Sequence, residues 1–197
     1  KNKTKKNKLI TIDRDDGSTA IKEGNKISII KCKKLIKAAY KSGADAAKLQ
    51  IVDPENSYDK SHPSFGVFKN KNFNHQELKS LIKFSKKLGI TLFATPGDFQ
   101  SLKKTIKLKM PAIKISSGLL TNLPLIKEAA YKKIPIILST GMAFKNEIVD
   151  AVNICKIKTN KICILKCTSI YPAPIDKINL RAIKSLNKKF NLPIGYS

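Results

Sequence analysis

The sequence predicts an α/β protein, on the strength of two repeating features. Short apolar segments alternate with longer segments whose apolar residues recur at helical spacing, which is the pattern of strands and helices around a parallel sheet. Several of the apolar segments end in small hydroxyl or glycine residues, as in ATP, ISSG, STG, CTS and GYS. With 197 residues, of which 42% are hydrophobic, the chain is long enough for one substantial core, so we expect a single domain.

Predicted helices and strands alternate from residue 32 onward. We predict strands at residues 46–52, 90–96, 112–117, 134–140, 162–169 and 192–197. We predict helices at residues 32–43, 75–89, 98–109, 123–133, 144–156 and 179–190. Gly43 and Gly89 end the first two helices, where a left-handed residue is common. The strands recur roughly every 20 to 30 residues from residue 90, which fits both a (β/α) barrel and a doubly wound sheet.

Two segments interrupt this alternation. Residues 1–31 form an irregular segment in which LITI is a candidate first strand and KISII a second, with no convincing helix between them. Residues 53–74 are polar and rich in Asn, Ser and Pro, and they show no helical period. A connection of that length in a compact domain is usually a functional loop or a disordered one.

The net charge of +25 raises the question of nucleic-acid binding, because a basic surface attracts phosphate. The lysines are spread along the chain, however, and the only arginines are Arg14 and Arg181, whereas base and phosphate recognition favours arginine. We therefore expect no nucleic-acid partner; a true nucleic-acid binder would lose affinity steeply with salt. The sequence contains no run of about 18 apolar residues and no secretory-signal centre, so we expect no membrane association and a cytoplasmic location.

The cysteines and histidines do not indicate a metal site. The four cysteines form no C-x-x-C pair, which is typical of a reduced cytoplasmic protein; they are Cys32, Cys155, Cys163 and Cys167. His62 and His75 are isolated in polar sequence, without the second ligand that zinc would need.

Three lysines lie inside predicted strands: Lys48, Lys114 and Lys166. Each could be an exposed residue of a lysine-rich protein, an amine nucleophile, or a cation that binds an anionic substrate. The segments ISSG (115–118) and LSTG (138–141) end strands before a helix and could hold an anion there. Neither has the spacing of a P-loop or a dinucleotide motif.

The ordered segments GADAAKLQ, TLFATPGDF, KISSGLLTNLPLI, PIILSTGMA, CTSIYPAP, INLRAIKSL and LPIGYS resemble the sialic acid synthase family. The family includes N-acetylneuraminate, legionaminic and pseudaminic acid synthases. The resemblance implies a (β/α)8 TIM-type barrel over residues 32–197. Such a barrel normally needs about 250 residues, so we expect it to be truncated, without its last units and without the family's C-terminal antifreeze-like domain.

The resemblance also implies an activity. Family members condense phosphoenolpyruvate with an N-acetylated hexosamine such as N-acetylmannosamine, releasing phosphate and giving a nine-carbon 2-keto acid. A divalent cation, Mn or Mg, activates the sugar aldehyde, and homodimers are common. No Schiff base forms, so the lysines bind anions. By motif, Lys48 and Lys114 would bind phosphoenolpyruvate and Tyr171 would face the substrate as a third catalytic residue. The remaining substrate contacts implied are Gln50, Thr95, Ser117, Ser169 and Ser197.

The sequence departs from the family pattern at several positions. Glu23 is the nearest counterpart of the active-site glutamate, Leu119 replaces an acidic residue, and Lys166 replaces a histidine. The sequence stops at GYS, where the family continues with a metal-binding histidine, so we expect no metal ligands in these 197 residues. The alternative to an active synthase is therefore a catalytically inactive remnant that at most binds phosphoenolpyruvate.

Overall fold

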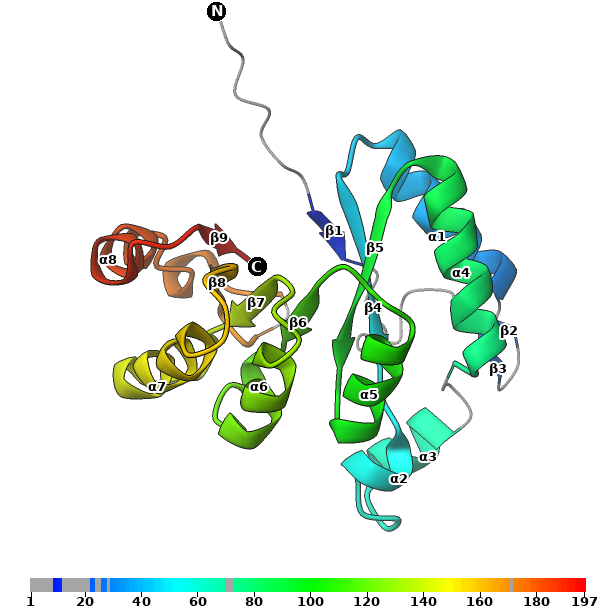
Figure 1. Ribbon diagram of the computed structural model, residues 1–197, viewed down its shortest axis with the longest axis horizontal. Coiled ribbons are helices and arrows are strands. Elements are labelled where there is room, and N and C mark those ends of the chain that lie inside the picture. The colour runs from blue at the N-terminus through cyan, green and yellow to red at the C-terminus, as the bar shows by residue number, and fades with distance from the viewer. Residues whose placement is uncertain (1–8, 12–21, 24–25, 28, 70–72, 171) are drawn as a thin grey trace, which may run out of the picture. The chain divides into compact units, whose positions relative to one another are not determined.

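A computed structural model describes residues 9–11, 22–23, 26–27, 29–69, 73–170 and 172–197. The chain divides into two compact units, Lys1–Pro111 (unit 1) and Ala112–Ser197 (unit 2). Each unit contains parallel strands followed by helices, so the predicted α/β class is confirmed (Figure 1).

Unit 1 is built on three parallel strands in the order β1-β4-β5. The strands are β1 Leu9–Thr11, β4 Ala46–Ile51 and β5 Thr91–Pro96. The main helices are α1 Ile29–Lys41, α4 His75–Leu88 and α5 Phe99–Lys107. A short antiparallel pair, β2 Lys22–Glu23 and β3 Lys26–Ile27, precedes α1. LITI thus contributes a strand, whereas the predicted strand KISII is wrong beyond its first two residues, because Ile29 begins α1.

The core of unit 1 lies between the strands and helices α1 and α4, which Figure 1 shows side by side. Alternate residues of β4 and β5 enter this core together with apolar residues of the two helices: Ala47, Leu49, Ile51, Leu92, Ala94, Cys32, Ile36, Leu78 and Leu81. Because successive side chains of a strand point to opposite faces, Lys48, Gln50 and Thr95 lie on the face away from these helices.

The polar segment between β4 and α4 contains two short helices that the sequence did not predict, α2 Pro54–Ser57 and α3 Pro63–Lys69. Both begin with proline, which suits the first turn of a helix because its missing N–H is not needed there. With four and seven residues, they are too short to show a helical period.

Unit 2 has four parallel strands in the order β6-β7-β8-β9. They are β6 Ile113–Ile115, β7 Ile136–Ser139, β8 Ile162–Lys166 and β9 Ile194–Tyr196. The helices are α6 Leu123–Ala130, α7 Lys145–Lys156 and α8 Arg181–Phe190, with 3-10 turns η1 Ser117–Leu119 and η2 Ile175–Lys177. The six strands and six helices predicted from residue 32 onward are thus confirmed, with ends shifted by a few residues.

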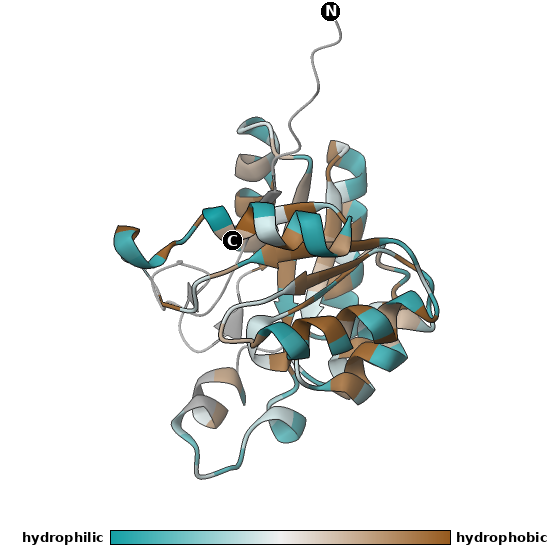
Figure 2. Cartoon of the chain, turned by 90° about the vertical axis from the view of Figure 1, so that its left-hand side faces the viewer, coloured by the Kyte–Doolittle hydropathy of each residue, from teal (hydrophilic) through white to brown (hydrophobic). Residues whose placement is uncertain are grey.

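One face of the unit 2 sheet is a row of buried apolar side chains. The row runs through paired positions of β6, β7 and β8: Ile113, Ile115, Ile136, Leu138, Ile162 and Ile164. The register places Lys114 beside Ile137, so Lys114 and Ser139 lie on the opposite face. Figure 2 shows mainly brown, hydrophobic strands and helices that carry both teal and brown residues.

Local signals fix the ends of α4. The Asn74 side chain accepts a hydrogen bond from the Glu77 amide at 2.9 Å, and the Glu77 carboxylate accepts one from the Asn74 amide at 2.8 Å, which is a capping box. Gly89 follows the helix with φ +79°, and Gly43 follows α1 with φ +77°, as predicted for both glycines.

Within the described residues, no helix is both long and apolar enough to cross a membrane. All four cysteines are free. Burial raises the pKa of Cys155 to about 12 and also raises the pKa of Cys163, so both side chains are held as neutral thiols.

Candidate functional site

In unit 1, three of the predicted site residues share the sheet face that points away from α1 and α4. Lys48 is only 1% exposed, and Gln50 is paired with Thr95 in the strand register. Thr95 is 2% exposed, and its hydroxyl has no hydrogen-bond partner among the described residues. Burying a polar group without a hydrogen-bond partner costs free energy, so this hydroxyl is available to donate a hydrogen bond to a bound ligand.

The loops that follow β4 and β5 are tied together by Asp98, which is 7% exposed. Its carboxylate accepts hydrogen bonds from the Asp53 amide at 2.7 Å and from the Ser57 hydroxyl at 3.1 Å. It also caps α5 by accepting from the amide and the hydroxyl of Ser101, both at 2.7 Å. Asp98 therefore holds the chain just beyond Gln50 and Thr95 in place.

We expect Asp98→Ala to lower the free energy of unfolding by about 2–4 kcal/mol, because it removes a helix cap and leaves buried donors unsatisfied. Urea denaturation followed by circular dichroism would measure the change. Asp176→Ala is the matched control: within the described residues, the Asp176 carboxylate pairs only with the exposed neighbour Lys177, at 3.2 Å, so its loss should cost less than about 0.5 kcal/mol. Equal effects of the two substitutions would contradict the structural role of Asp98.

In unit 2, a lysine and a buried hydroxyl again share one face of the sheet. Lys114 is half-buried on β6, and Ser139 lies at the end of β7 on the same face. Ser139 is 1% exposed, and no described residue forms a hydrogen bond with its hydroxyl. Each unit thus carries a lysine and a buried hydroxyl on the same sheet face. The hydroxyl lies near the carboxyl end of a parallel strand and has no hydrogen-bond partner among the described residues.

Three strand ends of unit 2 converge on Gly141. Its amide donates a hydrogen bond to the Ser117 hydroxyl at 3.0 Å. A Cβ atom at this position would collide with the Ser169 hydroxyl and would lie 2.9 Å from that of Ser117. The turn before it is fixed by Thr140, whose amide and hydroxyl both donate to the Leu165 carbonyl, at 3.0 and 2.9 Å. Ser117 and Ser169, both predicted site residues, are therefore brought together.

The remaining sequence predictions have different outcomes. The amide of Ser197 donates to the Lys166 carbonyl at 3.0 Å, which places Ser197 where β8 and β9 end. Lys166 lies on the sheet face opposite Lys114, and its ammonium donates to the Thr168 hydroxyl at 2.8 Å. Leu119 is half-buried in η1. Tyr171 lies outside the described residues, as does the side chain of Glu23.

The sequence reasoning missed Asp98, and it named Ser139 and Gly141 only as members of the segment LSTG. The sequence marks the segment LSTG as a candidate anion site, but only the strand register shows that Ser139 faces the same way as Lys114. Asp98 stands immediately before a helical period, where an N-cap residue is expected, and that signal alone could have indicated its role.

Metal-ligating side chains do not cluster in the described part of the chain. No group of three or more His, Cys, Asp or Glu side chains comes together there. Divalent cations such as Mg²⁺ and Mn²⁺ are held by carboxylates and imidazoles, so these residues do not by themselves form a site for one.

Comparison with known proteins gives the family. The model of the NeuB family matches residues 35–197. The chain belongs to this family, which confirms the resemblance to sialic acid synthases.

Individual relatives agree with this assignment. The chain is 39% identical over 166 residues to an uncharacterized protein of Methanocaldococcus jannaschii, covering 84% of this chain and 49% of that protein. It is 38% identical over 182 residues to the N,N'-diacetyllegionaminic acid synthase of Campylobacter jejuni, covering 84% and 54%. Among solved structures, an N-acetylneuraminic acid synthetase of Leptospira borgpetersenii in complex with citrate matches with a TM-score of 0.82 and 32% identity, covering 85% of this chain and 59% of that one. The chain spans about half the length of the curated relatives it matches.

Proposed function

We propose that this chain is the phosphoenolpyruvate-binding part of a (β/α)8 synthase barrel that condenses phosphoenolpyruvate with an N-acetylated hexosamine. In this reaction C3 of phosphoenolpyruvate attacks the aldehyde carbon of the open-chain sugar, water adds to C2, and phosphate leaves. The product is a nine-carbon 2-keto acid. The named synthases among its relatives support the proposal over an inactive remnant, as do Lys48 and Lys114, each of which shares a sheet face with a buried hydroxyl.

The observation that carries the proposal is the pair of buried hydroxyls, Thr95 and Ser139, that have no acceptor among the described residues. Each lies near the carboxyl end of a parallel strand, and each shares its sheet face with a lysine, Lys48 or Lys114. Hydroxyls and ammonium groups are donors to anions, and the carboxyl ends of the strands are where α/β proteins bind their ligands. Phosphoenolpyruvate carries both a carboxylate and a phosphate.

The proposed roles follow from charge. Lys48 and Lys114 hold the carboxylate and phosphate, and Lys–anion hydrogen bonds are about twice as strong as neutral ones. In unit 1 the Thr95 hydroxyl, and in unit 2 the hydroxyls of Ser117 and Ser139, are proposed donors to the substrate anion, and donors of this kind stabilise phosphate as it leaves. Gln50, Ser169, Ser197 and Tyr171 are proposed to complete the substrate contacts.

Two parts of the proposal concern the whole protein rather than these residues. In the family, a divalent cation, Mn or Mg, acts as a Lewis acid on the sugar aldehyde. We propose that the whole protein also requires this cation and forms a homodimer.

Binding of phosphoenolpyruvate to Ser139→Ala and Thr95→Val tests the proposal. Because these hydroxyls have no acceptor among the residues that the structure describes, their removal should leave the free energy of unfolding unchanged or raise it by about 1 kcal/mol. The same substitutions should weaken the binding of phosphoenolpyruvate about tenfold, since each removes a hydrogen-bond donor to a charged group. Isothermal titration and urea denaturation measure the two effects.

Thr121→Val is the matched control, since Thr121 is exposed and makes no side-chain hydrogen bond in the described part of the chain. Thr121→Val should change neither the free energy of unfolding nor the affinity for phosphoenolpyruvate. The proposal fails if the wild-type chain does not bind phosphoenolpyruvate, or if both buried-hydroxyl variants bind it as well as the control does.

A further inference from the structure

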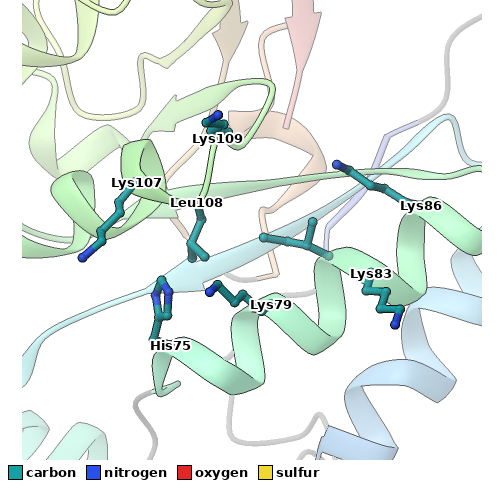
Figure 3. A pocket seen from close by; sticks show the side chains of 8 residues that line it. His75, Lys79, Lys83, Lys86, Lys107, Leu108 and Lys109 are labelled. Atoms are coloured by element: carbon teal, nitrogen blue, oxygen red, sulfur yellow. The ribbon is translucent and has the colours of Figure 1, made fainter.

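A pocket lies on the helix-covered side of unit 1, away from the face that carries Lys48. It has a volume of about 460 Å³, in the range of small-molecule sites, and lies open to solvent between α4 and the end of α5. Its lining consists of His75, Lys79, Ile82, Lys83, Lys86, Lys107, Leu108 and Lys109 (Figure 3).

The lining is far more basic than the chain as a whole. Five of the eight lining residues are lysine and none is acidic, whereas lysine and arginine together make up 39 of 197 residues. Within the described part of the chain, none of these five lysines forms an ion pair. Lys79, Lys83 and Lys86 are four and three residues apart on α4, a spacing at which like charges destabilise a helix. An anion bound beside Lys79 and Lys86 would reduce that repulsion.

The basic groups surround an apolar floor. In Figure 3 the side chains of His75, Lys79 and Lys107 lie around Leu108, while Lys83 points away from them. The pocket adjoins a hollow of about 240 Å³ at the start of β5, with which it shares Ile82, Lys86 and Lys109. Most of the other side chains around this hollow are apolar: Ile90, Leu92, Met110 and Pro111. The pocket thus carries the positive charge, and the hollow beside it is lined by apolar side chains, of which Ile90, Leu92 and Met110 belong to the buried core of unit 1.

Lys109 adds an independent observation. It follows α5 with φ +52°, in the left-handed region where glycine is unstrained and a lysine is not. This strained residue lines both the pocket and the hollow. A lysine at a position where glycine would fit better is consistent with a use for its charge.

We propose that this pocket binds an organic polyphosphate of the nucleoside di- or triphosphate class, with its phosphates among the lysines and its ring in the apolar hollow. Multiple phosphates match several ammonium groups, and a volume of about 460 Å³ suits a single nucleotide better than an oligonucleotide. The proposal goes beyond the proposed synthase function and does not depend on it, because the pocket shares no residue with the phosphoenolpyruvate site.

Isothermal titration of the 197-residue chain with adenosine triphosphate and with inorganic triphosphate, at about 50 mM salt, tests the proposal. The pocket variant is Lys79→Gln/Lys107→Gln, and the matched control is Lys184→Gln/Lys188→Gln, two exposed lysines on α8 with the same total charge. Circular dichroism establishes that both variants are folded.

We expect the pocket variant to bind adenosine triphosphate at least about tenfold more weakly, and the control to change affinity less than about twofold. Inorganic triphosphate should bind the wild type more weakly than adenosine triphosphate does. The affinity for phosphoenolpyruvate should be the same in the wild type, the pocket variant and the control variant. The proposal is overturned if the nucleotide does not bind, if both variants lose affinity equally, if inorganic triphosphate binds as tightly, or if a ten-nucleotide single strand binds more tightly than the mononucleotide.

Discussion

Lys48→Met is expected to weaken phosphoenolpyruvate binding by about 10- to 150-fold while the chain remains folded. Lys48 is 1% exposed and lies on the face of β4 that points away from α1 and α4, so a substrate anion there interacts with its ammonium group without much competition from water. A hydrogen bond to a charged group contributes about 1.5–3 kcal/mol, which sets the expected factor. Methionine has a similar length and an unbranched stem, so it fills the same space without the charge.

Two measurements separate binding from folding in this variant. Isothermal titration gives the affinity for phosphoenolpyruvate, and the increase in melting temperature with added phosphoenolpyruvate gives an independent estimate, because a ligand of the native state stabilises it. Lys184→Met, an exposed lysine of α8, is the control and should bind as the wild type does. If Lys48→Met is folded and binds within about twofold of the wild type, the proposed role of Lys48 is wrong.

The role of Lys48 illustrates how far the sequence could be interpreted. The segment AAKLQI is short, apolar and followed by a polar stretch, so its strand was predictable. Alternation also puts Lys48 and Leu49 on opposite faces. It does not say which face the helices cover, because both residues are buried; only the cluster that Leu49 forms with Ile36 and Leu78 settles that.

Other features depend on contacts between segments that are distant in sequence. Ser139 ends a run in which nearly every residue is apolar or small, so no pattern marks its hydroxyl as one without an acceptor. Asp98 holds Asp53 and Ser57, which are more than 40 residues away. The helices α2 and α3 are too short to give a period, and they depend on proline starts within a polar segment.

Gly141→Ala is expected to lower the free energy of unfolding by about 1–3 kcal/mol and to weaken phosphoenolpyruvate binding. The added Cβ would overlap the Ser169 hydroxyl, approach that of Ser117 to 2.9 Å and lie 3.2 Å from the Cys167 Cβ. To relieve these contacts, the ends of β6, β7 and β8 would have to separate. Urea denaturation and phosphoenolpyruvate titration of the same preparation measure both effects.

Gly118→Ala provides the matched control, because Gly118 lies in the same unit, one residue after Ser117, and a Cβ there would meet nothing within 4 Å. It should change stability by less than about 0.5 kcal/mol. The double variant Gly141→Ala/Ser169→Ala removes the hydroxyl that the new methyl group meets, so the two substitutions should be coupled and recover about 1 kcal/mol. Additive effects would show that Ser169 does not limit the space at Gly141. The close approach of Ser117, Gly141 and Ser169 would then have to be abandoned as the basis of a phosphate site in unit 2.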